Sequence, residues 1–294
     1  MLKHILAAIA VFISFTNYAQ NASSVGVWLD HLPYSNAVDV IENDNLVYCA
    51  TEQGLFIYDN NAKTIERLSK VNGLSDVGLT CLARSDKHNL LLIGYSNGNI
   101  DLVEGERVTN VPEINLSANY SGLKRINNIA VAGDFAYFCT EFGIVQYDLV
   151  ARVVRETFII GLQGDPVNVT DVVLTPDSMY AATPVGLLQA SLQDQLINFE
   201  NWSKSPGLGE PINEVAYFNS RVMANKVSPP DKDSIFYREN NEWKYASEII
   251  FMANVRDLRA DKGLLLVSNG FSAMAYRPDF TDLLQHAGGG NGQA

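Results

Sequence analysis

The residue types that perform acid–base or nucleophilic chemistry are scattered along this sequence. The four histidines stand far apart, and their spacing groups none of them with a serine and an aspartate into a catalytic triad: His4, His31, His88 and His286. The zinc-protease motif HExxH, the hydrolase motif GxSxG and the phosphate-binding P-loop are all absent from the sequence. Asp231 and Asp233 form too short a run for a calcium-binding loop. Paired carboxylates of a glycosidase remain the one open catalytic arrangement. No motif supports it, so the sequence favours a binding or assembly module without metal or cofactor.

The three cysteines, Cys49, Cys81 and Cys139, do not suggest a metal site or a redox motif. None of them forms a CxxC pair, and an odd number leaves at least one thiol unpaired. Cys49 and Cys139 fall within apolar strand-like runs. We therefore expect small buried hydrophobic side chains and not functional thiols.

The charge balance excludes one class of partner. The chain has 33 acidic and 21 basic residues, a formal net charge of −12. Binding to nucleic acid requires clustered lysines and arginines against the phosphates, so nucleic acid is an unsuitable partner. The same argument disfavours a broad contact with an anionic membrane, and Lys124-Arg125 is at most a small local basic patch.

The two ends of the sequence differ in composition from the rest of the chain. Residues 1–20 place Lys3 and His4 before a short apolar run that ends near Ala19, which predicts a secretory signal peptide. A short N-terminal anchor is the alternative, although the apolar run is too short to span a bilayer comfortably. Residues 286–294 are rich in glycine and predict a flexible tail or a truncated end. The expected location is exported, in the periplasm or at the outer-membrane surface or outside the cell.

A turn motif recurs through the part between these ends. Its fullest copies are Ala50–Asp59 and Cys139–Asp148, in which an apolar run, a polar turn with glycine and an alternating strand follow one another. The central glycines lie at intervals of 44, 45, 43 and then 84 residues: Gly54, Gly98, Gly143, Gly186 and Gly270. Glycine suits such a turn because it adopts positive φ without steric cost. A strand-rich repeat of about 43 residues predicts an all-β fold, a β-propeller.

Each repeat predicts four strands. The turn motif supplies two of them, an apolar strand precedes it and a more polar strand follows it. Six repeats can be delimited, at 34–77, 78–121, 122–167, 168–211, 212–251 and 252–285, within a propeller of residues 21–285. A seventh blade outside this chain is the alternative. Trp28 resembles Trp202 and Trp243, which fall on outermost strands. We therefore expect the Trp28 segment to complete the last blade and close the ring.

Antiparallel topology places the glycine turns and the blade-to-blade connectors at the same end of the propeller. The other turns are short, whereas this end carries the irregular and longer loops, and loops carry function more often than strands do. The predicted ligand or partner face consists of Glu52, Asp76, Tyr95, Asn97, Tyr120, Lys124, Arg125, Glu141, Asp165, Pro229 and Pro230. The alternative is that Glu52 and Glu141 recur only because the blade recurs. No catalytic or metal-binding residue is predicted.

The repeat text also resembles a known family. Thr51-Glu52-Gln53-Gly54-Leu55 followed by Tyr58-Asp59, and then Lys70–Asp76, resembles the two-component-regulator type of propeller repeat. In order along the chain, Trp28–Tyr34, Ala50–Asp59, Ser69–Val77 and Leu91–Leu102 are similar to the N-terminal propellers of the PorZ family, from the type IX secretion system of Bacteroidetes. The resemblance covers nearly all of residues 26–285.

This resemblance implies a non-enzymatic scaffold at the cell surface. PorZ-family proteins are implied to work in an attachment complex with the sortase PorU and with PorV and PorQ, and to deliver anionic lipopolysaccharide to PorU. The acidity of this chain fits poorly with an anionic glycan bound by this propeller, so a protein-docking role is expected here. The alternative is an extracellular ligand-sensing propeller of a hybrid two-component receptor.

Overall fold

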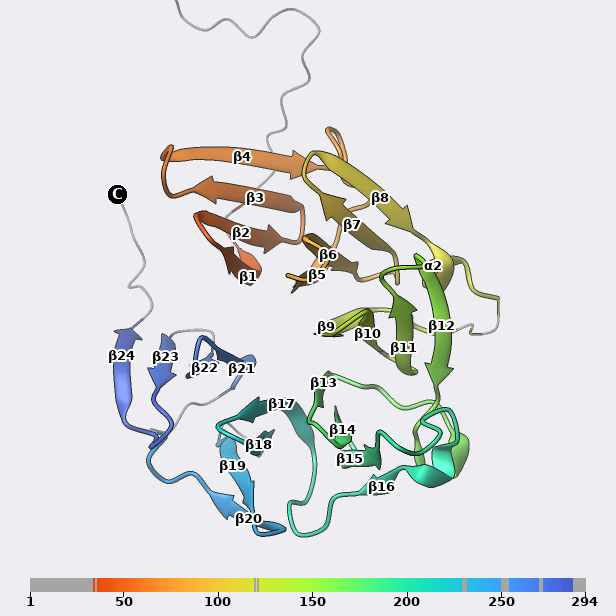
Figure 1. Cartoon of the computed structure of the whole chain (residues 1–294), viewed down its shortest axis with the longest axis vertical. Coiled ribbons are helices and arrows are strands. Elements are labelled where there is room, and N and C mark those ends of the chain that lie inside the picture. The colour runs from red at the N-terminus through yellow and green to blue at the C-terminus, as the bar shows by residue number, and fades with distance from the viewer. Residues whose placement is uncertain are drawn as a thin grey trace, which may run out of the picture. The chain divides into compact units, whose positions relative to one another are not determined.

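Six four-stranded antiparallel sheets make up the fold and surround a common axis (Figure 1). The computed structural model describes residues 34, 36–118, 120, 122–228, 232–249, 254–269 and 272–287, without the side chains of 282–287. In every sheet the strands pair in chain order, so each sheet is one sequence repeat. The first strand of each sheet lies nearest the axis in Figure 1, and the fourth strand lies at the periphery. The protein is therefore a six-bladed β-propeller, as the repeat predicts.

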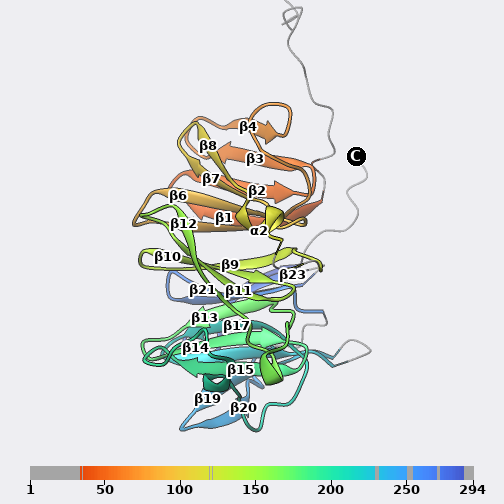
Figure 2. The same cartoon turned by 90° about the vertical axis from the view of Figure 1, so that its right-hand side faces the viewer.

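The first three blades lie within the first three predicted repeats. Blade one comprises β1 (Ala37–Asn43), β2 (Leu46–Thr51), β3 (Gly54–Asp59) and β4 (Thr64–Ser69). Blade two comprises β5 (Leu79–Ser85), β6 (Leu90–Tyr95), β7 (Ile100–Glu104) and β8 (Arg107–Val111). The short helix α2 (Glu113–Leu116) follows, at the periphery in Figure 1 and toward the viewer in Figure 2. Blade three comprises β9 (Ile126–Ala132), β10 (Phe135–Thr140), β11 (Gly143–Asp148) and β12 (Val153–Phe158).

The last three blades follow the same plan. A 3-10 turn, η1 (Leu162–Gly164), leads into blade four, which comprises β13 (Asp171–Leu174), β14 (Ser178–Thr183), β15 (Gly186–Ser191), η2 (Phe199–Asn201) and β16 (Ser203–Lys204). Blade five comprises β17 (Ile212–Phe218), β18 (Arg221–Lys226), β19 (Ser234–Glu239) and β20 (Glu242–Tyr245). Blade six comprises β21 (Asp257–Asp261), β22 (Leu264–Ser268), β23 (Ser272–Tyr276) and β24 (Asp282–Ala287).

The recurring threonine and glycine of the turn motif hold the hairpin between the second and third strands. In blade three the Thr140 hydroxyl donates to the Gly143 carbonyl at 2.8 Å, and the same bond recurs in blades one and four. Gly143 has φ of 149°, and a Cβ there would meet the backbone oxygen of Phe158. Gly54 has no positive φ, and a Cβ there would lie 2.6 Å from the Leu68 oxygen. The glycine is therefore needed chiefly because the fourth strand approaches closely.

Hydrophobic clusters join neighbouring blades along the ring. Five clusters of buried side chains fill the boundaries between blades one and two, two and three, three and four, four and five, and five and six. Each blade thus buries its faces against its neighbours, as a sheet with two apolar faces must. All three cysteines are free and buried, and Cys81 and Cys139 belong to these clusters, which confirms the prediction of buried hydrophobic side chains.

The boundary between blades six and one is held by charge among the described residues. The Arg259 guanidinium on β21 contacts Asp39 of β1 at 2.9 Å and donates to the Val40 carbonyl at 3.3 Å. Lys262 and Glu42 form a second ion pair, at 3.1 Å. These contacts bring the first and last blades together without a buried apolar cluster from the described part of the chain.

The predicted closure by an N-terminal strand is corrected at one point. The outer position of blade six, which the sequence assigned to the Trp28 segment, is occupied by β24, paired with β23. The last repeat therefore supplies all four of its own strands, and β24 ends at Ala287, beyond the propeller end expected at residue 285. Trp28, the predicted signal peptide and most of the glycine-rich tail lie outside the described residues. In the described chain no helix has the length and apolar character needed to span a membrane.

Candidate functional site

The predicted partner face lies at one end of the propeller, where glycine turns and connectors contact one another. Between blades one and two, the Gly78 amide of the connector donates to the Glu52 carbonyl at 2.6 Å, and the Ser96 amide donates to the Gly78 carbonyl at 2.9 Å. Between blades three and four, the Val169 amide donates to the Thr140 carbonyl at 2.9 Å. These bonds confirm that turns and connectors share one end. We call this end the loop face.

Asp76 organises a small polar network on the loop face. Its carboxylate accepts hydrogen bonds from Lys70 at 2.9 Å, from the Asn97 amide at 2.5 Å and from the Val77 backbone amide at 2.9 Å. Partial burial alone would raise the pKa of Asp76, but these three donors outweigh it and hold the pKa below its ordinary value. Asp76 and Asn97 are therefore brought together as predicted, in a network that fixes the connector to the blade-two turn.

Tyr95 is not available to a partner. Its side chain is fully buried, and its hydroxyl donates to the Asp101 carboxylate at 2.6 Å. Asp101 is also buried and accepts from the Ser75 amide at 2.8 Å and from Asn110 at 3.1 Å. The prediction placed Tyr95 in the turn because the residues that follow it are polar. In the structure Tyr95 is the last residue of β6, and it holds the preceding connector from inside the blade. Its role is structural.

The long connector between blades two and three is fixed by its own side chains. The Lys124 ammonium donates to the carbonyls of Asn115 at 2.8 Å and Ser117 at 2.7 Å, which satisfies the end of α2. Tyr120 packs on Phe142 of the blade-three turn, with ring centroids 4.2 Å apart. Lys124 is thus committed to the connector, whereas its neighbour Arg125 is exposed.

Carboxylates supply the accessible chemistry of the loop face. Glu52 and Asp165 are exposed, and Glu141 is half-buried. None of these three carboxylates has a side-chain hydrogen bond or ion pair within the described part of the chain. Pro229 and Pro230, the remaining predicted residues, lie outside it. The face therefore presents unpaired negative charge to a partner, with Arg125 as an isolated cation among the predicted residues.

A second polar group lies along the axis and was missed by sequence reasoning. The inner strands carry four carboxylates and one cation, a set that we call the axial ring: Asp39, Asp171, Glu214, Asp257 and Arg259. Asp171 accepts from the Asn128 amide of blade three at 2.7 Å and from the Val215 backbone amide of blade five at 2.9 Å. Asp39 likewise accepts from the Leu82 amide of blade two at 2.8 Å. The ring thus ties adjacent inner strands together.

The axial ring gathers acidic groups in poorly solvated surroundings. Burial raises the pKa of Asp171 to about 7, against the hydrogen bonds that lower it. Burial first, and then the charges of Asp171 and Asp257, raise the pKa of Glu214 well above its ordinary value, although part of its surface is accessible. Burial also raises the pKa of Asp257, and Arg259, 2.8 Å away, opposes this. The guanidinium of the ring is already paired with Asp39 and Asp257, so the ring offers no free cation to an anionic ligand.

A sequence signal for the axial ring existed. Asp171, Glu214 and Asp257 recur at intervals of 43 residues, the period of the blade. Asp171 and Asp257 begin their inner strands, and Glu214 is the third residue of its own. An acidic residue that recurs near the start of the inner strand in three successive blades indicates a polar group at the axis. The glycine-turn motif is a stronger sequence pattern than this acidic spacing, so the prediction favoured the loop face.

His88, the one histidine whose side chain is described, lies away from the loop face. It pairs with Asp134 at 2.8 Å near the opposite end of the propeller. No group of three histidines, cysteines or carboxylates suited to a metal ion occurs among the residues with described side chains. The loop face instead combines fixed connectors with unpaired carboxylates, which suits contact with a complementary surface.

Comparison with known proteins identifies the family of the fold. Residues 47–203, more than half of the chain, match the family model described as the TSS9, PorZ, N-terminal beta-propeller domain. No curated protein sequence matches the chain. Among solved structures, PorZ of Porphyromonas gingivalis, described as an essential bacterial surface component of the type-IX secretion system, is similar with a TM-score of 0.70 and 20% identity. That match covers 85% of this chain and 33% of PorZ.

Two extracellular domains of putative hybrid two-component systems from B. thetaiotaomicron are also similar. One has a TM-score of 0.64 and 13% identity, and the match covers 87% of this chain and 35% of that domain. The other has a TM-score of 0.61 and 14% identity, and the match covers 82% of this chain and 33% of that domain. The chain thus spans about a third of the length of the solved structures it matches. Because these identities are low, the likeness to solved structures shows the fold, and the family model gives the assignment. The chain belongs to the family of PorZ N-terminal β-propeller domains of the type IX secretion system.

Proposed function

We propose that this chain is a non-enzymatic docking propeller of the type IX secretion attachment complex, exported and held at the cell surface. The observation that carries the proposal is the family match over residues 47–203. The similarity to PorZ, a surface component of that system, supports the location. PorU, PorV and PorQ are the partners that this role implies.

The loop face is the surface that we assign to docking. Its connectors are held by the Asp76 network and by the Lys124 contacts with the carbonyls at the end of α2, so a partner meets a preformed surface. Glu52, Glu141 and Asp165 offer unpaired carboxylates to basic side chains of that partner. The axial ring argues against holding an anionic lipopolysaccharide inside this propeller, since its one guanidinium is already paired with Asp39 and Asp257. In this proposal lipopolysaccharide delivery to PorU uses another part of the assembly.

A sensing role is the second candidate, and the two extracellular two-component domains support it through the fold alone. The two roles predict different companions in the cell. A tagged copy expressed from its own locus in the source bacterium would be cross-linked, purified and identified together with what it holds. The secretion role predicts recovery of the sortase and its partners, and loss of cargo attachment when the locus is deleted. Normal cargo attachment after deletion, together with a changed transcriptional response to extracellular glycan, would replace this proposal with the sensor.

A further inference from the structure

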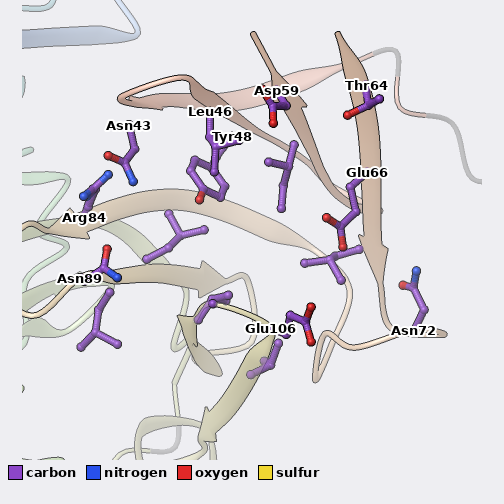
Figure 3. A pocket seen from close by; sticks show the side chains of 17 residues that line it. Asn43, Leu46, Tyr48, Asp59, Thr64, Glu66, Asn72, Arg84, Asn89 and Glu106 are labelled. Carbon is purple, nitrogen blue, oxygen red and sulfur yellow. The ribbon is translucent and has the colours of Figure 1, made fainter. Parts of the chain in front are cut away.

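A groove between blades one and two contains none of the predicted partner residues and none of the axial ring. It is a cavity of about 630 Å³, within the range of small-ligand pockets. Figure 3 shows side chains from blade one and blade two facing each other across it. The floor is apolar and includes Leu91 and Val103, whereas Glu66 and Glu106 stand on the two walls.

Blade two carries no aromatic side chain on its two outer strands, β7 and β8. In each of the four following boundaries, an aromatic from the third strand or the outer segment of a blade packs against the preceding blade: Tyr147, Trp202, Trp243 and Tyr276. Trp243 is the second residue of β20 and pairs with Arg238 of β19. Val108 is the second residue of β8 and pairs with Val103 of β7. Two valines thus occupy positions that elsewhere hold an aromatic side chain.

Two glutamates give the groove an unpaired negative charge. Glu66 and Glu106 are exposed, and neither has a hydrogen bond or an ion pair within the described part of the chain. Arg84, the cation of the lining, is already paired with Asp86 at 2.7 Å. Tyr48 projects into the groove, where an aromatic ring can pack against it (Figure 3). The groove therefore combines a vacant apolar site for an aromatic side chain with two unpaired carboxylates beside it.

We propose that this groove binds a peptide segment of a partner protein, which inserts a large aromatic side chain over Val103 and Val108 and places a neighbouring lysine or arginine between Glu66 and Glu106. The aromatic ring completes the packing layer that the other boundaries complete with their own residues. The cation pairs with carboxylates on both blades, so the segment clamps blade one to blade two. This inference does not depend on the secretion role, because the groove contains none of the carboxylates that we assign to docking.

The test uses blocked dipeptide amides as probes. Acetyl-Trp-Lys-amide would be titrated into the chain while the methyl signals of Leu91, Val103 and Val108 are followed by NMR. Acetyl-Ala-Lys-amide and acetyl-Trp-Glu-amide are the matched controls, which lack the aromatic ring or reverse the charge. We expect the Trp-Lys probe to shift these methyl signals, with an affinity about tenfold higher than that of either control. Equal shifts for all three probes, or no shift at the groove, would overturn the proposal.

Two variants make the assignment specific. Val108→Trp supplies the missing aromatic from the chain itself, so it should raise Tm and abolish probe binding. The double variant E66Q/E106Q keeps the floor and should retain the Trp-Lys probe while losing its preference over Trp-Glu. If Val108→Trp does not fold, the double variant decides: a preference that persists in E66Q/E106Q contradicts the proposal, and a lost preference supports it. Binding that survives in a folded Val108→Trp variant contradicts it as well.

Discussion

Replacing Arg259 by methionine should open the boundary between blades six and one in a pH-dependent way. Arg259 bridges Asp39 of blade one at 2.9 Å and Asp257 of its own blade at 2.8 Å, and its side chain is 37% exposed. Methionine preserves the apolar stem and removes the charge. Three carboxylates of the axis, Asp39, Asp257 and Glu214, then lose their shared cation.

The size of the effect follows from burial and from protonation. Removing one partner of a buried ion pair costs about 3–5 kcal/mol, and the exposure of Arg259 reduces this to about 2 kcal/mol at pH 8. Without Arg259 the folded-state pKa values of Glu214 and Asp257, already raised by burial, rise further. The folded variant then holds protons more firmly than its unfolded chain, so its stability falls as pH rises. At pH 5 the loss should be about 1 kcal/mol or less.

Urea unfolding of both proteins at pH 5 and pH 8 measures this difference. The double variant R259M/D257N is the control, because it removes a carboxylate together with the cation and should recover part of the loss at pH 8. An equal loss at both pH values, or a double variant less stable than the single variant at pH 8, would refute the electrostatic account of this boundary.

Three further predictions concern single positions. Burial raises the pKa of Asp171 to about 7, above the value of about 3.9 for an unfolded chain, so folding stability should fall as pH rises from about 4 to about 7. Asp171→Asn should flatten that part of a Tm-versus-pH profile, and an unchanged slope would count against the axial ring. Tyr95→Phe removes the donor to Asp101 and should cost about 1–2 kcal/mol in urea unfolding, whereas no loss would mean that the buried bond is not formed. Gly143→Ala should cost more than about 1 kcal/mol in the same assay because its Cβ meets the Phe158 oxygen, and a neutral effect would show that β12 can move.

The fold could be predicted from the sequence because the repeat is encoded locally. A threonine and a glycine three residues apart specify the hairpin, as the Thr140 bond to Gly143 shows. The same pair recurs at Thr51 and Thr183 and gives the period of the repeat. The length of the repeated region divided by this period gives the number of blades. Ring closure is different in kind, because it depends on which chain segment reaches the last blade. Sequence similarity around Trp28 suggested one answer, and β24 occupies the position instead.

The candidate sites were harder to predict because burial and cross-blade contact decide them. Tyr95 is followed by polar residues in the sequence, yet its side chain is buried in the blade and donates a hydrogen bond to Asp101. The axial carboxylates were visible as a 43-residue spacing, but only the geometry of the inner strands shows that Asp171 and Glu214 share one environment. The groove depends on an absent bulk at Val108, which becomes visible only when the strand register aligns it with Trp243.

The central claim is that the loop face docks a component of the secretion complex. A photo-crosslinking amino acid at Glu52, on the loop face, would be compared in living cells with the same amino acid at Asp261, an exposed residue that ends β21 at the opposite end. The account predicts a cross-link from position 52 to the sortase or one of its partners, lost on reversing the charges of Glu141 and Asp165, and no such product from position 261. Equal cross-linking from both positions, or none from position 52 while cargo attachment proceeds normally, would contradict it.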